Sequence, residues 1–352
     1  MIKSSFNVIG VMSGTSLDGI DLAHITFKIA EKWTFEIRNA ETVSYPEYWK
    51  DKLSNLVSID LETLKLIDED YTHYLADVIN GFLLKYQLHH IDAICSHGHT
   101  ALHQPEKSLT YQIGNLPSIS KLTRNTIICD FRTQDVLYDG QGAPLVPVGD
   151  RLLFSEYDYC INLGGFANIS SEVNKTRIAF DICPVNIVMN LFAEKLGYNF
   201  DKGGAIAKSG EIDESLLYQL NDIGYYSETP PKSLGLEWVN SIIMPILEQF
   251  KLSEEHILRT FIEHIAIQIA KAFKSGSKVL FTGGGTFNDF LLERIKAQKD
   301  FELVRPSEVI IEFKEALIFG LLGVLKLRGE VNCLSSVTGA NFDHSSGVIY
   351  YP

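Results

Sequence analysis

The chain has 352 residues, of which 45% are hydrophobic, and this length suits two domains that each bury a core of their own. It carries 31 Lys and Arg against 44 Asp and Glu, a formal net charge of -13, and no basic run, which argues against nucleic acid as a partner. Polar residues and glycine interrupt its apolar start, MIKSSFNVIGVMSG, so neither a signal peptide nor a membrane span is expected.

The cysteines are widely spaced and odd in number, and most lie in apolar, strand-like runs such as IDAICS and TIICD. This pattern is typical of reduced core residues in a cytoplasmic protein and not of a disulfide framework. The five positions are Cys95, Cys129, Cys160, Cys183 and Cys333.

The first part of the chain opens as a strand meander. Residues 6–11 form an apolar run that ends in the glycine turn MSGTSLDG, and residues 20–28 and 34–38 continue the strand pattern. Apolar residues at three- and four-residue steps predict an amphipathic helix over 61–84. Two buried strands are predicted further on, at 91–95 and 126–130.

The second part repeats this arrangement, which indicates two related α/β domains. A strand again runs into a glycine turn, and strands then alternate with helices. We expect one domain over 1–130 and the other over 131–329, with the tail at 330–352 packing on the first. The predicted elements are strands 159–163, 177–181 and 278–282 and helices 186–196, 257–273, one from about 287, and 313–328.

The first glycine turn, Gly14-Thr15-Ser16-Leu17-Asp18-Gly19, lies between two predicted strands. Glycine permits positive φ, so several backbone N–H groups can converge on an anion there, and Asp18 is a candidate Mg²⁺ ligand. A plain hairpin turn with a solvated Asp18 is the alternative.

Two more glycine turns, Gly164-Gly165 and Gly283-Gly284-Gly285, each follow an apolar strand. The last precedes a helix, whose first N–H groups suit a nucleotide. Tight packing explains any one such turn, but three in one chain favour nucleotide binding. No P-loop and no clean G-x-G-x-x-G are present, which argues against a dinucleotide enzyme.

Asp181 follows the predicted strand RIAF, at an edge where α/β proteins bind ligands. Its carboxylate suits a base that takes a proton from water or a hydroxyl. A cap for the helix that begins near Pro184 is the alternative.

Arg132 stands between Asp130 and Asp135 and precedes the Gly/Pro loop DGQGAPLVP, which resembles a binding loop more than a helix or strand. It suits a substrate carboxylate or phosphate, or else an ion pair with a neighbouring Asp. The histidine cluster SHGHTALH has zinc-like spacing without companion ligands, so substrate contacts or a polar loop are favoured over a metal. Its members are His97, His99 and His103.

Taken together, these segments resemble the anhydro-N-acetylmuramic acid kinase family over nearly the whole chain. The resemblance implies two RNase H-like α/β domains of the actin-like ATPase superfamily, which includes sugar kinases, Hsp70 and actin, with ATP in an interdomain cleft. The segments that carry it are GVMSGTSLDGID, SHGHT, QIGN, DFR, DGQGAPLVP, NLGGFANIS, FDICPVN, DKGG, PPKSLG, GGGTFN, KEALIFG and SSVTGA.

The same resemblance implies a cytoplasmic homodimer that uses ATP and Mg²⁺. With water, such kinases open 1,6-anhydro-N-acetylmuramic acid and phosphorylate its O6 during peptidoglycan recycling. Asp181 would be the catalytic base, Asp18 a metal ligand, and Arg132, His97 and Glu315 sugar contacts. The ATP-binding residues would be Gly14, Thr15, Ser16, Leu17, Asp18, Gly19, Ile20, Asp21, Gly164, Gly165, Gly283, Gly284, Gly285 and Asn288.

The chain departs from the family pattern in one segment, which reads FDICPVN where FDTGPGN is expected. Ile182, Cys183 and Val185 replace a threonine and two glycines, so this phosphate loop is expected to be altered. Two alternatives therefore stay open: another sugar or acetate-type kinase of the same fold, and a nucleotide-binding regulator without turnover.

Overall fold

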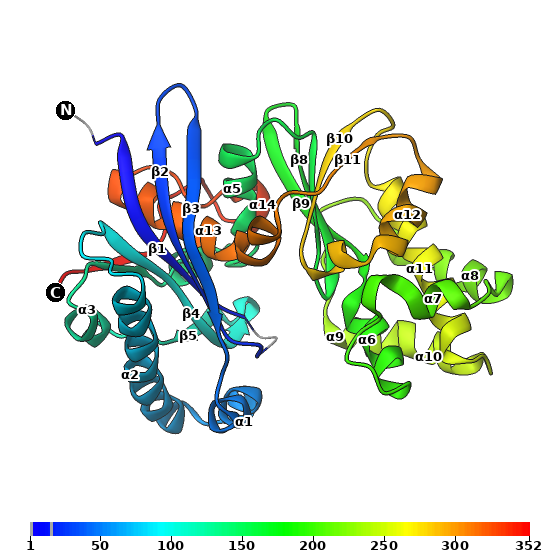
Figure 1. Cartoon of the computed structure of the whole chain (residues 1–352), viewed down its shortest axis with the longest axis horizontal. Coiled ribbons are helices and arrows are strands. Elements are labelled where there is room, and N and C mark those ends of the chain that lie inside the picture. The colour runs from blue at the N-terminus through cyan, green and yellow to red at the C-terminus, as the bar shows by residue number, and fades with distance from the viewer. Residues whose placement is uncertain (1–2, 15–16) are drawn as a thin grey trace. The chain divides into compact units, whose positions relative to one another are not determined.

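The computed structural model describes residues 3–14 and 17–352. The chain divides into two compact units (Figure 1): unit 1 comprises Met1–Leu153 and Phe313–Pro352, and unit 2 comprises Phe154–Glu312. The expected boundary at 130 therefore falls inside unit 1. Residues 131–153 stay with unit 1 because their apolar side chains, including Phe131 and Val148, are buried there.

The sheet of unit 1 has the strand order β12-β6-β4-β1-β2-β3, with β5 paired to β4. Strands β1, β2 and β3 form an antiparallel meander, and β4 and β6 run parallel to β1 in succession. The strands are β1 (Ser5–Ser13), β2 (Ile20–Ile29), β3 (Trp33–Val43), β4 (Ala93–Gln104), β5 (Leu109–Ile113), β6 (Ile127–Cys129) and β12 (Val348–Tyr350).

The helices of unit 1 pack on both faces of this sheet. Asp60 caps α2 by accepting hydrogen bonds from the backbone N–H groups of Glu62 and Thr63, and the apolar stripe of α2 joins the core. The helices are α1 (Glu47–Ser54), α2 (Leu61–Lys85), α3 (Ser118–Thr123), α4 (Thr133–Leu137), α5 (Val146–Leu153), α13 (Glu308–Arg328) and α14 (Ser335–Thr338), with one-turn 3-10 helices at Leu56–Ser58 and Pro105–Lys107.

Successive side chains of β1 point to opposite faces of the sheet, so the strand contacts helices on both sides. Ile9 and Val11 face the core shared with α2. Gly10 faces α13, where a Cβ atom built on it would lie 1.9 Å from the carbonyl oxygen of Ala316. Glycine is thus required at position 10 because the helix backbone sits directly on the strand.

Unit 2 repeats the topology of unit 1. Its sheet has the order β11-β10-β7-β8-β9, in which β7, β8 and β9 form an antiparallel meander and β10 and β11 run parallel to β7. The same five-strand arrangement in both units confirms the predicted pair of RNase H-like domains. The strands are β7 (Tyr159–Leu163), β8 (Phe166–Val173), β9 (Thr176–Pro184), β10 (Lys278–Thr282) and β11 (Glu302–Val304).

The core of unit 2 is organised around α11, whose side chains are buried on most of its surface. The other helices surround it and cover the sheet. They are α6 (Asn186–Lys195), α7 (Ala205–Ser209), α8 (Glu214–Asn221), α9 (Leu236–Trp238), α10 (Met244–Gln249), α11 (Glu254–Lys271) and α12 (Asp289–Gln298), with short 3-10 or π turns at Lys202–Gly204, Gly224–Ser227, Val239–Ile243 and Gly284–Phe287.

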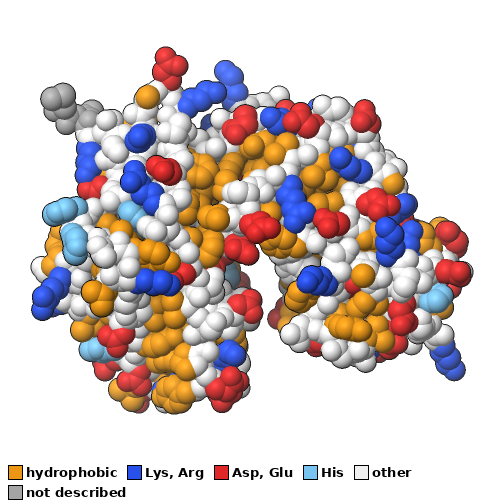
Figure 2. Space-filling view, in the orientation of Figure 1, with side chains coloured by type: hydrophobic (Ala, Val, Ile, Leu, Met, Phe, Trp, Pro, Cys, Tyr) orange, Lys and Arg blue, Asp and Glu red, His pale blue; other side chains and the backbone are white. Residues whose placement is uncertain are grey.

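One prediction on local structure was wrong. Strand β4 extends from Ala93 to Gln104, so the histidine cluster lies on a strand and not in a polar loop. Within the described residues no helix has the length and apolar character to cross a membrane. On the face shown in Figure 2, acidic and basic side chains are interspersed.

Candidate active site

The first glycine turn connects β1 to β2, whose end residues Ser13 and Ile20 are paired. Thr15 and Ser16 lie outside the described residues. Leu17 has a positive φ of 59° and donates its N–H to the Gly14 carbonyl over 3.4 Å. A Cβ atom at Gly19 would lie 2.6 Å from the carbonyl oxygen of Val43, so this position requires glycine.

The two ends of this turn differ in exposure. Asp18 is exposed, whereas the Ile20 side chain is fully buried in the core of unit 1. Asp21 accepts a hydrogen bond of 2.6 Å from the Thr42 hydroxyl. Asp18 therefore offers a carboxylate to solvent, and Ile20 has only its backbone to offer a ligand.

A buried hydroxyl cluster supports the strand that enters this turn, and the sequence did not reveal it. Ser13 bonds to Nδ1 of His99 over 2.8 Å and to the hydroxyls of Tyr45 and Tyr71. Burial lowers the pKa of His99 to about 4, so its ring is neutral at pH 7. The cluster fixes the position from which the glycine turn departs.

In unit 1 the structure also brings His97, Arg132 and Glu315 into one neighbourhood. Arg132 donates from Nε to Nε2 of His97 over 2.9 Å and from Nη1 to the Gly142 carbonyl over 2.6 Å. Burial lowers the pKa of Arg132, and the negative charge of Glu315 opposes this shift. In the described part of the chain, neither Asp130 nor Asp135 forms the ion pair with Arg132 that the sequence left open.

The ring of His97 is buried and uses both nitrogens within the protein. Nδ1–H donates to the Gly98 carbonyl over 2.9 Å, and Nε2 accepts from Arg132. Burial and the charge of Arg132 hold the pKa of His97 well below its usual range. His97 is thus placed to orient Arg132, with no ring nitrogen left for a sugar.

Glu315 lies on α13 and is exposed, while its neighbour Lys314 is buried. Lys314 pairs with Asp150 of α5 over 2.7 Å, and both side chains are almost fully buried. This buried pair joins α13 to α5 and so fixes the position of the helical turn on which Glu315 lies.

In unit 2 the two glycine turns follow neighbouring parallel strands, since Thr282 of β10 pairs with Asn162 of β7. Gly283 has φ 81°, and a Cβ atom there would lie 2.6 Å from Oδ1 of Asn162. A Cβ atom at Gly285 would lie 2.8 Å from that of Leu163, whereas one at Gly284 would meet no atom within 4 Å. The turns are therefore in contact, and Gly284 presents its backbone to open space.

The segment after Asp181 is buried. Ile182, Cys183 and Val185 belong to the core of unit 2, and the N–H of Val185 donates to the Gly165 carbonyl over 2.7 Å. The N–H of Asn186 likewise donates to the Gly164 carbonyl over 3.3 Å. The start of α6 is thus joined to the Gly164-Gly165 turn, and these N–H groups have partners within the protein.

Asn288 has a structural role. It is almost fully buried and caps α12 by accepting from the N–H of Leu291 over 2.9 Å. This cap sets the direction in which α12 leaves the glycine turn.

Asp181 lies inside β9, at a bulge in its pairing with β8. Asn168 pairs with Asp181 and Ala167 with Cys183, so Ile182 is the extra residue. A bulge redirects side chains and is common beside active sites. The cap position of α6 is Val185, without a side-chain hydrogen bond, so the alternative that Asp181 caps this helix is wrong.

The loop PPKSLG holds the Asp181 carboxylate, a role that the sequence did not reveal. The N–H of Leu234 donates to Oδ2 over 2.9 Å, and the Tyr225 hydroxyl donates to the carbonyl oxygen of Asp181 over 2.6 Å. Lys232 donates to the Tyr225 carbonyl and lies over its ring. Burial raises the pKa of Asp181, and the bond from Leu234 opposes the rise. A carboxylate with one oxygen held and raised basicity suits a general base.

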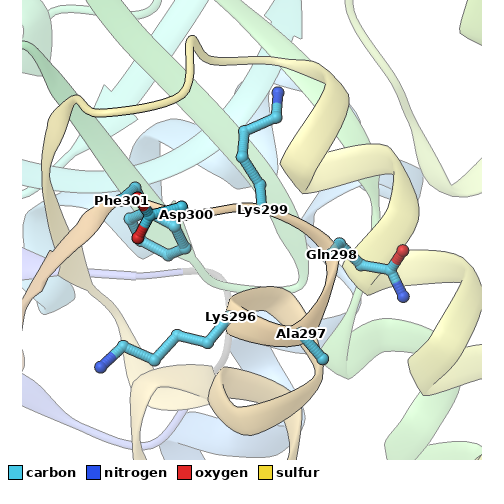
Figure 3. Close-up of a pocket in the computed structure, with 6 residues that line it drawn as sticks. All are labelled: Lys296, Ala297, Gln298, Lys299, Asp300 and Phe301. Atoms are coloured by element: carbon cyan, nitrogen blue, oxygen red, sulfur yellow. The ribbon is translucent and has the colours of Figure 1, made fainter.

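The hollow shown in Figure 3, of about 480 Å³, is lined by Lys296–Phe301. It lies where α12 ends, whereas Gly283–Asn288 precede the start of that helix. Lys299 donates to the carbonyl oxygens of Ala270 and Phe273. The hollow is therefore separate from the candidate site.

The amino-acid sequence is similar to that of a known protein family and of named members of it. Residues 6–352 match the sequence model of the anhydro-N-acetylmuramic acid kinase family. A protein named anhydro-N-acetylmuramic acid kinase from Mannheimia succiniciproducens is 33% identical over 97% of this chain and 98% of its own length. One of the same name from Vibrio cholerae is 34% identical over 98% of each chain.

Proposed function

We propose, from the premise that this chain belongs to the anhydro-N-acetylmuramic acid kinase family, that it phosphorylates 1,6-anhydro-N-acetylmuramic acid with ATP and water. The product would be N-acetylmuramic acid 6-phosphate, formed during cell-wall recycling. The observation that carries the proposal is Asp181, which stands at a strand bulge with one carboxylate oxygen held by Leu234.

In the proposed reaction, Asp181 takes a proton from water as the water oxygen bonds to C1 of the sugar. The C1–O6 bond breaks, O6 bonds to the γ-phosphorus, and ADP leaves with the electron pair of the broken P–O bond. Burial raises the pKa of Asp181, which makes its carboxylate a stronger base. The N–H of Leu234 holds Oδ2 of Asp181, so the other carboxylate oxygen, Oδ1, would face water in each turnover.

Arg132, oriented by His97, would bind a negative group of the sugar or nucleotide, and Glu315 would contact the sugar. In unit 2 the backbone of Gly283–Gly285 would bind ATP. Because Gly284 has open space where a side chain would stand, nucleotide can approach its backbone closely.

We further propose Mg²⁺ as the metal, the cytoplasm as the location and a homodimer as the assembly. Asp18 fits Mg²⁺ because it is exposed and offers hard carboxylate oxygens. When bound, the ion would neutralise charge on the transferring phosphoryl group. All five cysteines lie within the described residues, are buried and form no disulfide, as suits a reducing compartment.

The experiment is mass spectrometry of the sugar after incubation with the protein, ATP and Mg²⁺ in ¹⁸O-water. We expect a sugar 6-phosphate with a single ¹⁸O atom, bonded to C1. A phosphorylated sugar without the label would contradict the proposed attack by water. A simple hexose that is phosphorylated in place of the anhydro sugar would favour another sugar kinase of this fold.

One observation favours a second candidate, a nucleotide-binding regulator. The N–H groups of Val185 and Asn186 are bonded to the Gly165 and Gly164 carbonyls, so this turn offers fewer donors to a phosphate. Nucleotide binding measured by calorimetry, without phosphorylation of any sugar, would support the regulator and contradict the kinase.

A further inference from the structure

A second cluster of reactive side chains lies in unit 1, outside the site described above. Among residues 3–14 and 17–352, Asp135, Cys333 and His344 alone bring three donor atoms of metal-binding type within 4.8 Å of one another. Asp135 and Cys333 are fully buried, and His344 is 6% exposed. Asp135 comes from α4, and the other two come from the C-terminal segment around α14.

The backbone presets the positions of Cys333 and His344. They form an isolated antiparallel bridge and exchange both N–H to carbonyl bonds, each of 3.1 Å. Residues opposite each other in such a bridge place their side chains on the same face. Asn332 reinforces the bridge, since Oδ1 accepts from the N–H of Ser346 and Nδ2 donates to the Leu322 carbonyl.

The ring of His344 directs an unpartnered nitrogen into the cluster. Nδ1 faces the Phe342 carbonyl over 3.1 Å and therefore carries the proton, which leaves a lone pair on Nε2. Nε2 is buried without a hydrogen-bond partner, 3.6 Å from Oδ1 of Asp135. A lone pair that faces a buried carboxylate is unfavourable unless a cation lies between them. The Tyr138 ring packs edge-on against the imidazole with centroids 5.1 Å apart.

The donor set of one carboxylate, one thiol and one imidazole suits zinc, and its spacing is near that of a zinc site. The bond lengths of tetrahedral zinc imply ligand atoms about 3.3–3.6 Å apart. Oδ1 of Asp135 lies 2.9 Å from Sγ of Cys333 and 3.6 Å from Nε2 of His344, and all three ligand atoms lie within 4.8 Å of one another. The Phe342 carbonyl that accepts from Nδ1–H is the usual partner of a metal-bound histidine.

The surroundings fix the carboxylate as well. Oδ2 of Asp135 accepts from the N–H of Gly142 over 2.7 Å, and Oδ1 accepts from the Thr338 hydroxyl over 2.8 Å. The Cys333 thiol donates to Oδ1 of Asp135 over 2.9 Å when no cation is bound. A bound divalent cation removes this proton, which passes to solvent.

We propose that Asp135, Cys333 and His344 bind Zn²⁺ as a structural site, with the Thr338 hydroxyl beside the fourth position. The ion would join the C-terminal segment to α4 and to the loop at Gly142. The Gly142 carbonyl of that loop accepts a hydrogen bond from Arg132. The zinc site would therefore hold the loop that positions Arg132, without contacting substrate itself.

The test uses the full chain in two samples, one as purified without added metal and one treated with a chelator. Mass spectrometry of the purified protein should find one equivalent of zinc. Co²⁺ added to the chelated protein should give a thiolate-to-cobalt charge-transfer band. Cys333→Ala and His344→Ala should lower the zinc content at least tenfold. Cys160 is also buried but lies in unit 2, so Cys160→Ala should keep the full zinc content.

Two results would overturn the proposal. One is a chelated wild-type protein that gives no charge-transfer band with Co²⁺, a measurement that does not depend on whether a variant folds. The other is an unchanged zinc content in Cys333→Ala and His344→Ala. A sugar kinase activity that survives chelation and Mg²⁺ repletion leaves the kinase proposal standing in either case.

Discussion

Arg132 donates a hydrogen bond from Nε to Nε2 of His97 over 2.9 Å, which joins the loop after β6 to the middle of β4. Because Nδ1–H of the same ring donates to the Gly98 carbonyl, the ring is held in one tautomer. The histidine is thus a positioning residue, and Nε and Nη1 of the guanidinium are held in place.

Replacing Arg132 with Lys should weaken sugar binding, because an ammonium group cannot bond His97, the Gly142 carbonyl and a ligand in the same fork geometry. Loss of one charge-assisted bond of about 1.5–3 kcal/mol corresponds to a rise of roughly 10- to 150-fold in KM for the sugar. Steady-state kinetics measure it. Arg305→Lys, at an exposed pair with Asp289, is the control and should leave KM unchanged.

Gly284→Ala should lower ATP affinity without lowering stability. A methyl group there meets no protein atom within 4 Å, so it would collide only with a bound nucleotide. Gly283→Ala is the matched neighbour and should destabilise the protein, because φ is 81° and the methyl group would lie 2.6 Å from Asn162. Calorimetry and thermal unfolding separate the two effects. Unchanged ATP affinity in Gly284→Ala would place the nucleotide elsewhere.

Gly10→Ala should destabilise unit 1 by about 3 kcal/mol, because its methyl group would overlap the carbonyl of Ala316 and push α13 away from β1. Chemical denaturation gives the free energy of unfolding. Gly81→Ala, in the exposed interior of α2 with no atom within 4 Å, should instead stabilise by up to about 1 kcal/mol. Equal effects at the two positions would argue against the close contact of helix and strand.

Stability should fall as the pH drops from about 6.5 to about 4. Burial lowers the pKa of His99 to about 4 in the folded state, so only the unfolded chain binds a proton in this window. The full contribution is present above pH 6.5, and the loss amounts to at most about 3 kcal/mol for this group. Denaturant titrations of wild type and His99→Gln should show a shallower pH dependence in the variant. His89→Gln, at an exposed position, should retain the wild-type slope.

Periodicity revealed the fold because both units repeat a strand meander followed by alternating helices and strands. It could not reveal the bulge at Asp181, since a bulge is defined by the register with β8 and not by residue type. Nor could it place Ile182, Cys183 and Val185, which read as an altered phosphate loop but are core residues.

The partners of the site residues were hidden for a similar reason. Leu234 holds Asp181 through its backbone N–H, which carries no side-chain signal, and the two lie 53 residues apart. Two prolines and a glycine in PPKSLG indicated a rigid loop but not its target. The cluster of Asp135, Cys333 and His344 was hidden as well, because its first two members lie 198 residues apart in the chain.

The most direct test of the central claim is the rate of sugar phosphorylation by Asp181→Asn. The amide keeps the size of the side chain and an oxygen that can accept from Leu234, but it cannot take a proton from water. We expect ATP to bind as in wild type while the rate falls about 10²-fold or more, the usual scale for loss of a general base. Asp289→Asn, at an exposed carboxylate of the same unit, is the control. A rate for Asp181→Asn within a few fold of wild type would contradict the account.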